Sequence, residues 1–445
     1  MNKPKIGVVG VCSHYESGAQ RFDELMESAW DELTKADLDV ICFKKPVYSP
    51  ADAIEACEMF KDAEIETLAI MDVTWVCDSL KYIFIKELGL PVAFWAVPYT
   101  ETFSIGCIQN FGSVLKTQNI HYEYVYGLPA DAALVERVKK IAFAGRIVKE
   151  VKNMRISLLG PRQTWRVAGP QDMTMEEWDF SRVIGPTILH NEMEEITDAA
   201  KLISDDEARK ALVSLSERTG KSNCSEETML WMAKVYMASS EMIKESGLSA
   251  VCAECYPNYS GLMNLTSSWL ADDGIILDTE GDIANAVVQY MLNIAAGGGA
   301  CALGEIGSFD DEQNFLGVAH EGSTAASLAE SLDRIQLSPS GENGCFVGLP
   351  VKPMDKCTVC DMQGVNGEYQ LMISSGSTVA ASHEEWVEGG EKLLIKLRLD
   401  GVKPSVAIEK MMNAGLHHHL VVKEGDYTDI LEIACKYMGI RIVRI

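Results

Sequence analysis

The amino-acid sequence predicts an α/β protein with two Rossmann-like parallel-sheet domains followed by a β-rich C-terminal domain. Short apolar runs alternate with amphipathic helical segments near the N-terminus, and the alternation starts again after residue 150. This pattern is typical of βαβ units, which build parallel sheets. From about residue 345, short β-rich segments separated by turns replace it. We therefore divide the chain into domains at 1–150, 151–340 and 341–445.

The first domain shows four apolar runs that predict strands: KIGVVGVC (5–12), DVICFK (39–44), ETLAIMDV (66–73) and PVAFWAV (91–97). Helical spacing follows the first run, with apolar residues at Phe22, Leu25, Met26, Trp30 and Leu33. Further helices are expected at about 51–62 and 78–89. The spacing of Gly7 and Gly10 differs from the GxGxxG fingerprint, so dinucleotide binding is not expected.

The second domain begins with the strand-like run VKNMRISLLGP (151–161), and long amphipathic helices follow to about residue 248. Two short apolar runs, LSAVCAECYP (248–257) and GIILDT (274–279), predict further strands. The segment 281–299 predicts a helix, with Asp282 in its first turn and glycines at its C-terminal end. The third domain is expected to be barrel-like or mixed, from the segments GCFVGLPVKP, KCTVCDMQ, EYQLMISSGSTVA and KLLIKLRL.

The formal net charge of −26 at pH 7 argues against nucleic acid and anionic membranes as partners, because binding to phosphate needs Lys and Arg. The apolar run at the N-terminus is about six residues long, too short for a signal-peptide core. No run of 18 or more apolar residues predicts a transmembrane helix. Without an export signal, the 13 cysteines are interpreted as reduced thiols of a cytoplasmic protein.

Four short segments carry candidate chemistry, and each also has a purely structural interpretation. The segment TEGD (279–282) places two carboxylates where a strand ends and a helix begins, at the edge where open α/β sheets bind ligands. Asp282 is equally suited to cap the helix without any function.

The segment CAEC (252–255) places Glu254 at another strand end, where an isolated buried carboxylate would be costly. Its two cysteines, together with Cys357 and Cys360, could form a four-cysteine zinc site, although structural zinc ribbons use shorter gaps. Buried free thiols are the simpler interpretation.

Histidines supply the remaining candidates. His320 closes the strand-like run FLGVAH and could be purely structural. Residues 417–419 form a triplet at the start of an apolar strand, in AGLHHHLVV. Since alternate side chains of a strand face opposite ways, His417 and His419 should share one face and His418 should point away. Two carboxylates and one or two histidines suit Mn2+, Mg2+ or Co2+ better than a thiolate zinc site.

At these residues the sequence resembles the superfamily of L-fucose isomerase and L-arabinose isomerase, which are metal-dependent aldose–ketose isomerases. DTEGDIANA resembles a T/C-E-x-D segment whose aspartate binds the metal, which corresponds to Asp282. DDEQNFLGVAHEGS is similar to the stretch before a histidine, which stands in an H-C-G segment in fucose isomerase-like proteins and in a metal-binding H-M-L segment in arabinose isomerases; it corresponds to His320. In GLHHHLVVKEGD, counting back from the shared Gly425 places the metal histidine at His419.

The segment ECYP resembles the C-W-P segment near the glutamate ligand of that superfamily, which corresponds to Glu254, and PVAFWAVP resembles a strand ending in W-A-x-P. Two positions depart from its pattern. Glu321 stands where H-C-G has a cysteine, and Glu254 precedes Cys255 instead of following the proline.

The resemblance implies a metal site of Glu254, Asp282, His419 and His320 that holds Mn2+, or else Mg2+ or Co2+, with Glu254 and Asp282 also catalytic. It implies reversible conversion of an aldose to a ketose through an enediol, on a small-molecule sugar, by a homo-oligomer (a trimer or hexamer) with its site near a subunit contact. The alternatives are a non-catalytic sugar-binding or regulatory protein, and an epimerase or lyase that uses the same intermediate. No cluster of Lys and Arg lies near the motifs, which favours a neutral sugar.

Overall fold

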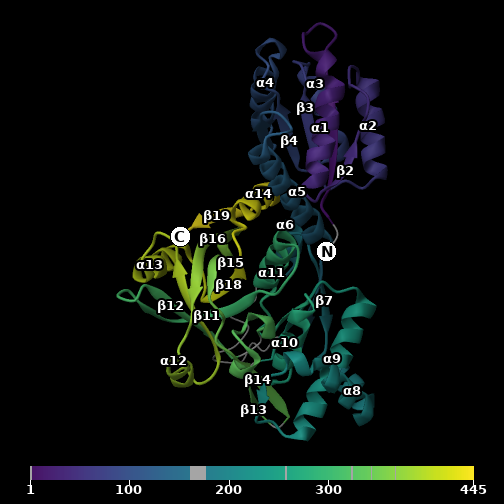
Figure 1. The fold of residues 1–445 in the computed structure, drawn as a ribbon. Helices are drawn as coiled ribbons and strands as arrows, with labels where there is room; N and C mark the ends of the chain where they lie inside the picture. The colour runs from purple at the N-terminus through teal and green to yellow at the C-terminus, as the bar shows by residue number, and fades with distance from the viewer. Residues whose placement is uncertain (1–2, 161–176, 256–257, 322–323, 342, 366) are drawn as a thin grey trace. The chain divides into compact units, whose positions relative to one another are not determined.

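The computed structural model describes residues 3–160, 177–255, 258–321, 324–341, 343–365 and 367–445, and shows the predicted α/β class (Figure 1). The chain divides into two compact units, Met1–Lys149 and Glu150–Ile445. The final residues of two quoted segments, 256–257 of ECYP and 322–323 of AHEGS, lie outside the described residues. None of the described helices is long and apolar enough to span a membrane.

The first unit is built on a five-stranded parallel sheet with the strand order β2-β1-β3-β4-β5. Its strands are β1 (Lys5–Val11), β2 (Asp39–Cys42), β3 (Thr67–Asp72), β4 (Val92–Ala96) and β5 (Glu123–Tyr126). The first four coincide with the four apolar runs, because strands buried on both faces read as nearly continuous apolar sequence.

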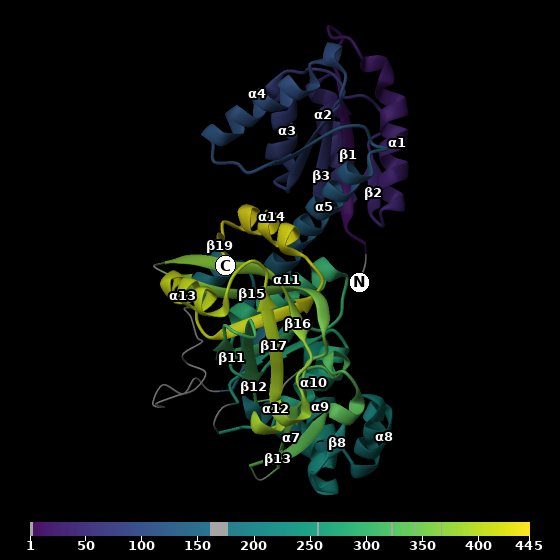
Figure 2. The ribbon, with the colours of Figure 1, turned by 60° about the vertical axis from the view of Figure 1, so that its left-hand side comes forward.

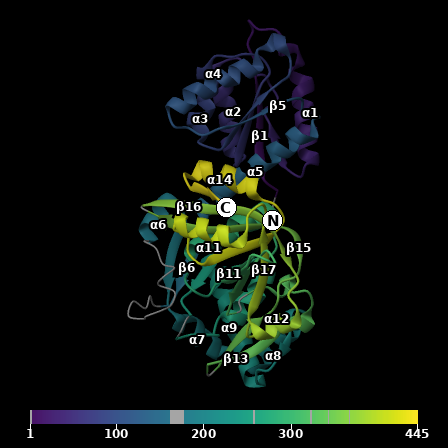
Figure 3. The ribbon, with the colours of Figure 1, turned by 90° about the vertical axis from the view of Figure 1, so that its left-hand side faces the viewer.

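Helices cover both faces of this sheet. They are α1 (Phe22–Lys35), α2 (Pro50–Asp62), α3 (Asp78–Leu88), α4 (Ser104–Thr117) and α5 (Ala132–Asn153), the last of which crosses the boundary between the units (Figure 3). Gly10 of β1 packs against Phe22 and Met26 of α1, whereas Gly7 packs against Phe60 of α2, so α1 and α2 cover opposite faces. Ser49 and Asp52 form a capping box that starts α2.

The second unit contains a four-stranded parallel sheet with the strand order β10-β9-β6-β7. Its strands are β6 (Arg155–Leu159), β7 (Thr187–Asn191), β9 (Ala250–Ala253) and β10 (Ile276–Asp278). The helices of this part are α6 (Glu177–Val183), α7 (Met193–Leu202), α8 (Asp205–Leu215), α9 (Glu226–Ser246), α10 (Asn264–Asp272) and α11 (Ile283–Ala296).

A seven-stranded sheet forms the rest of this unit, in the order β15-β18-β11-β12-β17-β16-β19. Because β15 also pairs with β16, six of these strands close into an antiparallel ring, and β19 adds to β16 in parallel. The strands are β11 (Ala302–Asp310), β12 (Phe315–His320), β15 (Met354–Val365), β16 (Glu368–Val379), β17 (Leu393–Leu399), β18 (His419–Glu424) and β19 (Arg441–Arg444). The expectation of a β-rich C-terminal region is thus met by a closed barrel.

Three helices accompany the barrel, namely α12 (His383–Glu388), α13 (Pro404–Ala414) and α14 (Thr428–Met438). Figure 2 shows α13 and α14 beside the barrel strands. A small sheet in the order β14-β13-β8 completes the unit, with β8 (Lys221–Ser222), β13 (Gln336–Ser340) and β14 (Gly344–Gly348). One hydrophobic cluster joins barrel residues such as Val318, Leu397 and Leu420 to Trp269 of α10 and Cys345 of β14.

The barrel recruits β11 and β12 from the range 151–340, which the sequence division gives to the second α/β domain. Both strands pair with partners from the C-terminal part of the chain, β11 with β18 and β12 with β17. The ring therefore starts at Ala302. This arrangement brings the end of the barrel next to the strand ends of the four-stranded sheet.

Candidate metal centre

Four side chains with metal-binding donors meet in the second unit. Glu280 lies in the turn between β10 and α11, Glu305 lies in β11, His320 ends β12, and His419 begins β18. One donor atom of each residue lies within 4.8 Å of the donor atoms of the other three. Among the described residues, this is the group that could hold a metal ion.

Strand register brings three of these residues together. Glu305 is directly opposite His419 in the antiparallel pair of β11 and β18, and opposite Ala319 in the pair of β11 and β12. Side chains directly opposite each other in such pairs are neighbours on one face of the sheet. His320 follows Ala319 and comes to the same end of the barrel. The barrel therefore supplies both histidines and one carboxylate.

The fourth residue, Glu280, is positioned by the TEGD turn. Asp278 at the end of β10 accepts hydrogen bonds through Oδ1 from the backbone N–H of Glu280 at 2.9 Å and of Asp282 at 2.8 Å. Gly281 has a φ of +75°, a conformation that side-chain-bearing residues rarely adopt. The turn thus lifts Glu280 out of the sheet toward the histidines.

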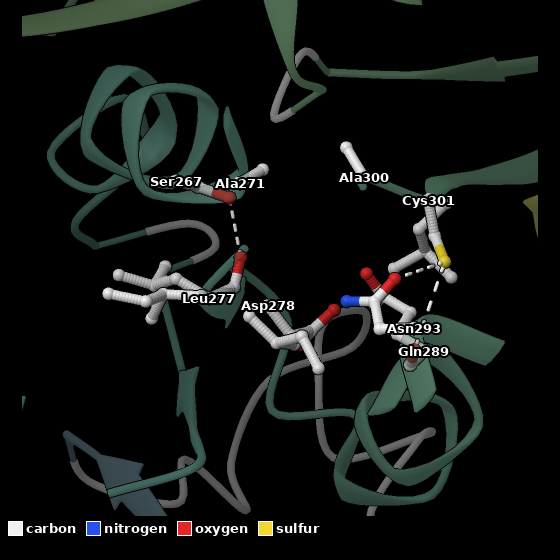
Figure 4. Close-up of a pocket in the computed structure, with 11 residues that line it drawn as sticks. Ser267, Ala271, Leu277, Asp278, Gln289, Asn293, Ala300 and Cys301 are labelled. Carbon is white, nitrogen blue, oxygen red and sulfur yellow. Dashed lines mark hydrogen bonds between the residues drawn. The ribbon is translucent and has the colours of Figure 1, made fainter. Parts of the chain in front are cut away.

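Asp278 itself is buried behind the turn. Burial, reinforced by the nearby charge of Asp282, raises the pKa of Asp278 to about 7. Asp278, Asn293 and Cys301 line a small cavity of about 20 Å³, in which the Cys301 thiol donates to Asn293 Oδ1 at 3.4 Å (Figure 4). A cavity of this size holds about one water molecule. This cavity lies behind the TEGD turn and is too small for a sugar.

The donor atoms converge around Glu280. Its Oε2 lies 3.2 Å from His419 Nε2, and its Oε1 lies 3.5 Å from His320 Nε2. Glu305 Oε1 lies 4.0 Å from His419 Nε2. Burial would raise the pKa of Glu280, but the hydrogen bond and charge of His419 outweigh it, so the pKa lies below its ordinary value. Glu280 is therefore ionised at neutral pH.

The two histidines differ in their surroundings. Burial lowers the pKa of His320, and neither of its ring nitrogens has a hydrogen-bond partner among the described residues. Burial also disfavours the charged form of His419, but hydrogen bonds and charges from Asp282 and Glu280 raise its pKa well above the ordinary value. A neutral His320 is ready to donate a lone pair, whereas His419 has to lose a proton before it can bind a cation.

Asp282 lies behind His419 rather than among the four donors. Its Oδ2 accepts from His419 Nδ1 at 2.8 Å and from Asn285 Nδ2 at 2.8 Å, and its Oδ1 caps α11 by accepting from Asn285 N at 2.9 Å. The hydrogen bond and charge of His419 lower the pKa of Asp282 in spite of burial. A carboxylate that holds one histidine nitrogen directs the other nitrogen at a metal. The side chain of Asp282 thus both caps α11 and orients His419.

The polar network continues away from the site. Asn285 Nδ2 also donates to Asp361 Oδ1 at 3.1 Å, and Asn285 Oδ1 accepts from the backbone of Met362 at 3.1 Å. His417 Nδ1 lies 3.0 Å from Asp361 Oδ1. His417 therefore belongs to this supporting network, and His418 is half exposed, with its Nε2 4.0 Å from Glu305 Oε1. The prediction that His417 and His419 share one face of a strand is wrong, because β18 begins at His419. The Nε2 atoms of His418 and His419 each lie 4.0 Å from Glu305 Oε1, whereas His417 faces Asp361.

Glu254 is fully buried at the end of β9, beside the TEGD turn. It forms an isolated antiparallel bridge with Glu280, and its Cγ would lie 3.0 Å from a Cβ placed on Gly281. The structure thus puts Glu254 next to a member of the four-residue group but not within it. Its role as a ligand stays a prediction.

The donor set fits a divalent cation. Two imidazoles and two carboxylates are acceptable ligands for Mn2+, Mg2+ or Co2+, and the buried ring nitrogens of His320 have no hydrogen-bond partner among the described residues. A cation bound between the four groups would satisfy one of these nitrogens. No cysteine is in the group: all 13 thiols are free, and those of both CxxC pairs are buried.

A small cavity of about 10 Å³ adjoins this centre within the second unit. Its lining includes Glu280 and His320 together with Cys255, Ser260, Gly261, Asn264, Thr279, Glu321 and Phe346. Glu321, which stands at the cysteine position of the H-C-G segment, accepts a hydrogen bond from Lys392 Nζ at 3.0 Å. Polar side chains therefore make up much of the wall of this cavity, which has room for about one water molecule.

The motifs predict Glu254, Asp282, His320 and His419 as metal ligands, and the four-residue group contains two of them, His320 and His419. Its two glutamates are not predicted as ligands. Asp282 is predicted as a ligand but lies behind His419, because its carboxylate accepts from the Nδ1 of that histidine. Glu280, the other carboxylate of TEGD, receives no role of its own from the motifs. Glu305 is missed. A signal for it exists, because it is an acidic residue in the otherwise apolar run CALGEIGSF.

Comparisons with known proteins give related sequences but no matching family model. The chain is 20% identical over 440 residues to sulfoquinovose isomerase of Priestia aryabhattai, with 93% of this chain and 94% of that protein covered. It is 22% identical over 435 residues to sulfoquinovose isomerase of Alkalicoccus urumqiensis, covering 93% and 90%. It is 21% identical over 443 residues to sulfoquinovose isomerase of Clostridium sp. (strain MSTE9), covering 94% and 93%. The similarity thus extends over nearly the whole of both chains.

Proposed function

We propose that this protein is a metal-dependent sugar isomerase that interconverts an aldose and a ketose. The observation that carries the proposal is the group of two glutamates and two histidines whose donor atoms lie within 4.8 Å of one another. The names of the three relatives support isomerisation of a sugar. Together with the motif positions, they also support membership of the fucose and arabinose isomerase group.

In this proposal Glu280, Glu305, His320 and His419 hold a divalent cation, for which Mn2+ is the first choice and Mg2+ or Co2+ the alternatives. When bound, such a cation supplies Lewis acidity to the carbonyl and hydroxyl oxygens of a sugar. The chain itself fixes the ligands. Asp282 keeps His419 oriented, and the buried network through Asn285 keeps Asp282 in place.

The chain must also move a proton between two neighbouring sugar carbons, for which a positioned carboxylate is the usual group. Asp282 is engaged by His419 and Asn285, so it acts through His419 as a positioning residue. Glu254 adjoins Glu280 at the bridge between their backbones. We therefore assign to Glu254 the removal of the proton from C2 of the aldose and its return to C1.

The substrate class follows from two considerations. The relatives are named for sulfoquinovose, a glucose with a sulfonate on C6, whereas the described cavity wall contains Glu280 and Glu321, and the nearby Lys392 is paired with Glu321. A surplus of acidic groups favours a neutral sugar over an anion. We therefore propose a neutral aldose, and sulfoquinovose is the competing substrate.

The test is a product analysis with matched sugars. Protein stripped by a chelator and reloaded with Mn2+ is incubated in D2O with glucose, mannose, fucose, arabinose, glucose 6-phosphate and sulfoquinovose, and the products are followed by NMR. We expect a ketose with deuterium at C1 from at least one neutral aldose, and no reaction in the chelated sample. Glucose and sulfoquinovose differ only at C6, so their rates compare a hydroxyl with a sulfonate directly.

Other products would support the alternatives. Binding of sugars without any conversion indicates a sugar-binding protein, and shortened products or C2 epimers indicate a lyase or epimerase. Preference for sulfoquinovose over glucose contradicts the neutral substrate but leaves the isomerase intact. We also propose a homo-oligomer, a trimer or hexamer, and sedimentation velocity on the same sample measures this directly.

A further inference from the structure

A pair of cysteines outside the candidate metal centre has unusual geometry. Cys224 follows the short strand β8, Cys345 lies in β14, and their sulfur atoms are 3.5 Å apart although 121 residues separate them in the chain. A disulfide bond is about 2.05 Å long, so a displacement of about 1.5 Å would join them. The two thiols are therefore close enough to react with each other after a small movement.

The small three-stranded sheet holds the two thiols in place. Asn223 N donates to Leu337 O at 2.9 Å, which fixes the chain just before Cys224 to β13. Cys345 is opposite Pro339 of the same strand, and its N–H donates to Gly261 O at 2.9 Å. Since both backbones are anchored to β13 or its surroundings, the approach of the sulfur atoms is built into the fold.

The two thiols have complementary properties. Cys224 is half buried, so a small oxidant can reach it, whereas Cys345 is fully buried. The hydrogen-bond interaction with Cys345, helped by one with Ser222, lowers the pKa of Cys224 to about 7, while the same interaction and burial raise the pKa of Cys345. Thiolates are the reactive form of cysteine. Cys224 is therefore suited to attack first and Cys345 to respond second.

We propose that Cys224 and Cys345 are a redox-sensitive pair that closes to an intramolecular disulfide when the protein meets hydrogen peroxide. The Cys224 thiolate attacks one peroxide oxygen, the O–O bond breaks, and hydroxide leaves and takes up a proton to become water. The sulfenic acid on Cys224 is then attacked by Cys345 sulfur, which gives its proton to the departing hydroxide as a second water. Two thiols lose two electrons, and one peroxide is reduced to two waters.

The pair of cysteines adjoins the wall of the cavity that contains Glu280 and His320. Phe346, the next residue after Cys345, lines that cavity together with Gly261, and Gly344 packs so closely that a Cβ there would lie 2.9 Å from Ser260 O. Closure of the disulfide would pull on β14, and hence on this wall. The thiol chemistry is independent of the proposed sugar isomerisation, because it needs neither a metal nor a sugar.

The experiment maps thiols in the native, full-length protein. Samples are treated with hydrogen peroxide, denatured in N-ethylmaleimide, digested without reduction and analysed by mass spectrometry. We expect a crosslinked peptide pair that contains Cys224 and Cys345, lighter by two hydrogen atoms than the separate thiol peptides and lost after dithiothreitol. Fully buried Cys360, whose pKa burial raises well above the ordinary value, should stay a maleimide adduct and serves as the internal control.

Two variants check the assignment. Cys224→Ser should abolish the crosslink, and Cys77→Ser, which removes an exposed cysteine elsewhere, should leave its yield unchanged. The proposal is overturned if Cys224 and Cys345 of the wild-type protein are recovered as separate adducts after peroxide treatment, or if Cys224 crosslinks to another cysteine. The wild-type measurement decides the matter even if a variant folds poorly.

Discussion

The two ring nitrogens of His419 face different groups, one in the supporting network of Asp282 and one in the four-residue group. Nδ1 is held by Asp282 at 2.8 Å, and Nε2 lies 3.2 Å from Glu280. This fixes the tautomer that a neutral ring adopts: the proton stays on Nδ1 and the lone pair of Nε2 faces the other donors. His419 is therefore the histidine of the triplet that belongs to the four-residue group.

Replacing individual histidines of the triplet should distinguish His419 from its neighbours. In His419→Ala the affinity for Mn2+ should fall by more than about 100-fold, because a ligand is lost rather than an outer-shell group. His418→Ala, at a side chain that is 44% exposed, should change it little. Isothermal titration calorimetry with Mn2+ measures both. Equal and small losses in the two variants would contradict the assignment of His419.

Asp282→Asn tests whether orientation of His419 matters beyond capping of α11. Asn is an equally good cap, so the helix content should be kept, but the loss of the charge beside His419 should lower the melting temperature. Asn cannot accept as a charged group from His419, so Mn2+ affinity should fall by about 10–100-fold. Circular dichroism and a Mn2+ titration on the same preparation check the two expectations. Unchanged affinity would reduce Asp282 to a helix cap.

The raised pKa of His419 predicts opposite effects of pH on two properties. A histidine whose folded pKa exceeds its ordinary 6.5 stabilises the chelator-treated protein fully below pH 6.5, and this contribution is lost as pH rises through the folded pKa. Mn2+ competes with the proton on His419, so Mn2+ affinity should instead rise over the same pH range.

Melting curves and Mn2+ titrations from about pH 6 to about pH 9 measure both trends, and His419→Gln, which cannot titrate, is the control. Its melting temperature in chelator should lack the component that wild type loses with rising pH. Identical pH profiles for the wild type and this variant would show that His419 is neutral throughout.

At the scale of elements, the turn between β10 and α11 decides where Glu280 points. Asp278 accepts two backbone N–H groups of this turn, and Asp282 caps the helix that follows. The turn also depends on Gly281, which has a positive φ and leaves room for Glu254. A side chain at this position would have to strain the backbone and displace a buried carboxylate at once.

Gly281→Ala therefore has a matched control in Gly274→Ala. Both glycines have a similar positive φ, +75° and +78°, but a Cβ on Gly274 meets nothing within 4 Å. Gly274→Ala should cost about 1–2 kcal/mol from the left-handed backbone alone. Gly281→Ala should cost more and should also weaken Mn2+ binding. Urea denaturation and Mn2+ titration measure the difference, and equal losses of stability with intact binding would argue against the close contact with Glu254.

At the scale of the whole molecule, the chain has two compact units, and the four donors all come from the second. Barrel strands and the strand ends of a parallel sheet supply these donors jointly. Neither sheet by itself provides the complete set. The centre is therefore a product of packing between two sheets of the same unit.

Hydrogen exchange with mass spectrometry should reveal this division. Binding to the native state stabilises it by about 2.7 kcal/mol when the free ligand is at about 100 times its Kd. Mn2+ should thus slow exchange in α11, β12 and β18, which carry or adjoin the donors. The strands of the first unit, such as β3, should be nearly unaffected. Protection spread equally over both units would indicate that the cation binds elsewhere.

The sequence by itself determined the α/β class, the first four strands and the strand ends that carry carboxylates, and the resemblance of its last motif singled out His419 among three adjacent histidines. These features are local, since the period of apolar residues and the alternation of a strand are written in neighbouring positions. Two features of the site therefore follow from local sequence alone: a carboxylate turn after β10, and a histidine at the start of β18.

Only the tertiary structure decided which carboxylates face the histidines. Asp282 and His419 are 137 residues apart in the chain, and Glu305 meets His419 through the register of two antiparallel strands. A helix cap and a metal ligand require the same side chain at Asp282, so sequence cannot distinguish them. Closure of the barrel, which recruits β11 and β12, likewise depends on pairing between distant strands, and that long-range pairing is what places Glu280 and Glu305 beside His320 and His419.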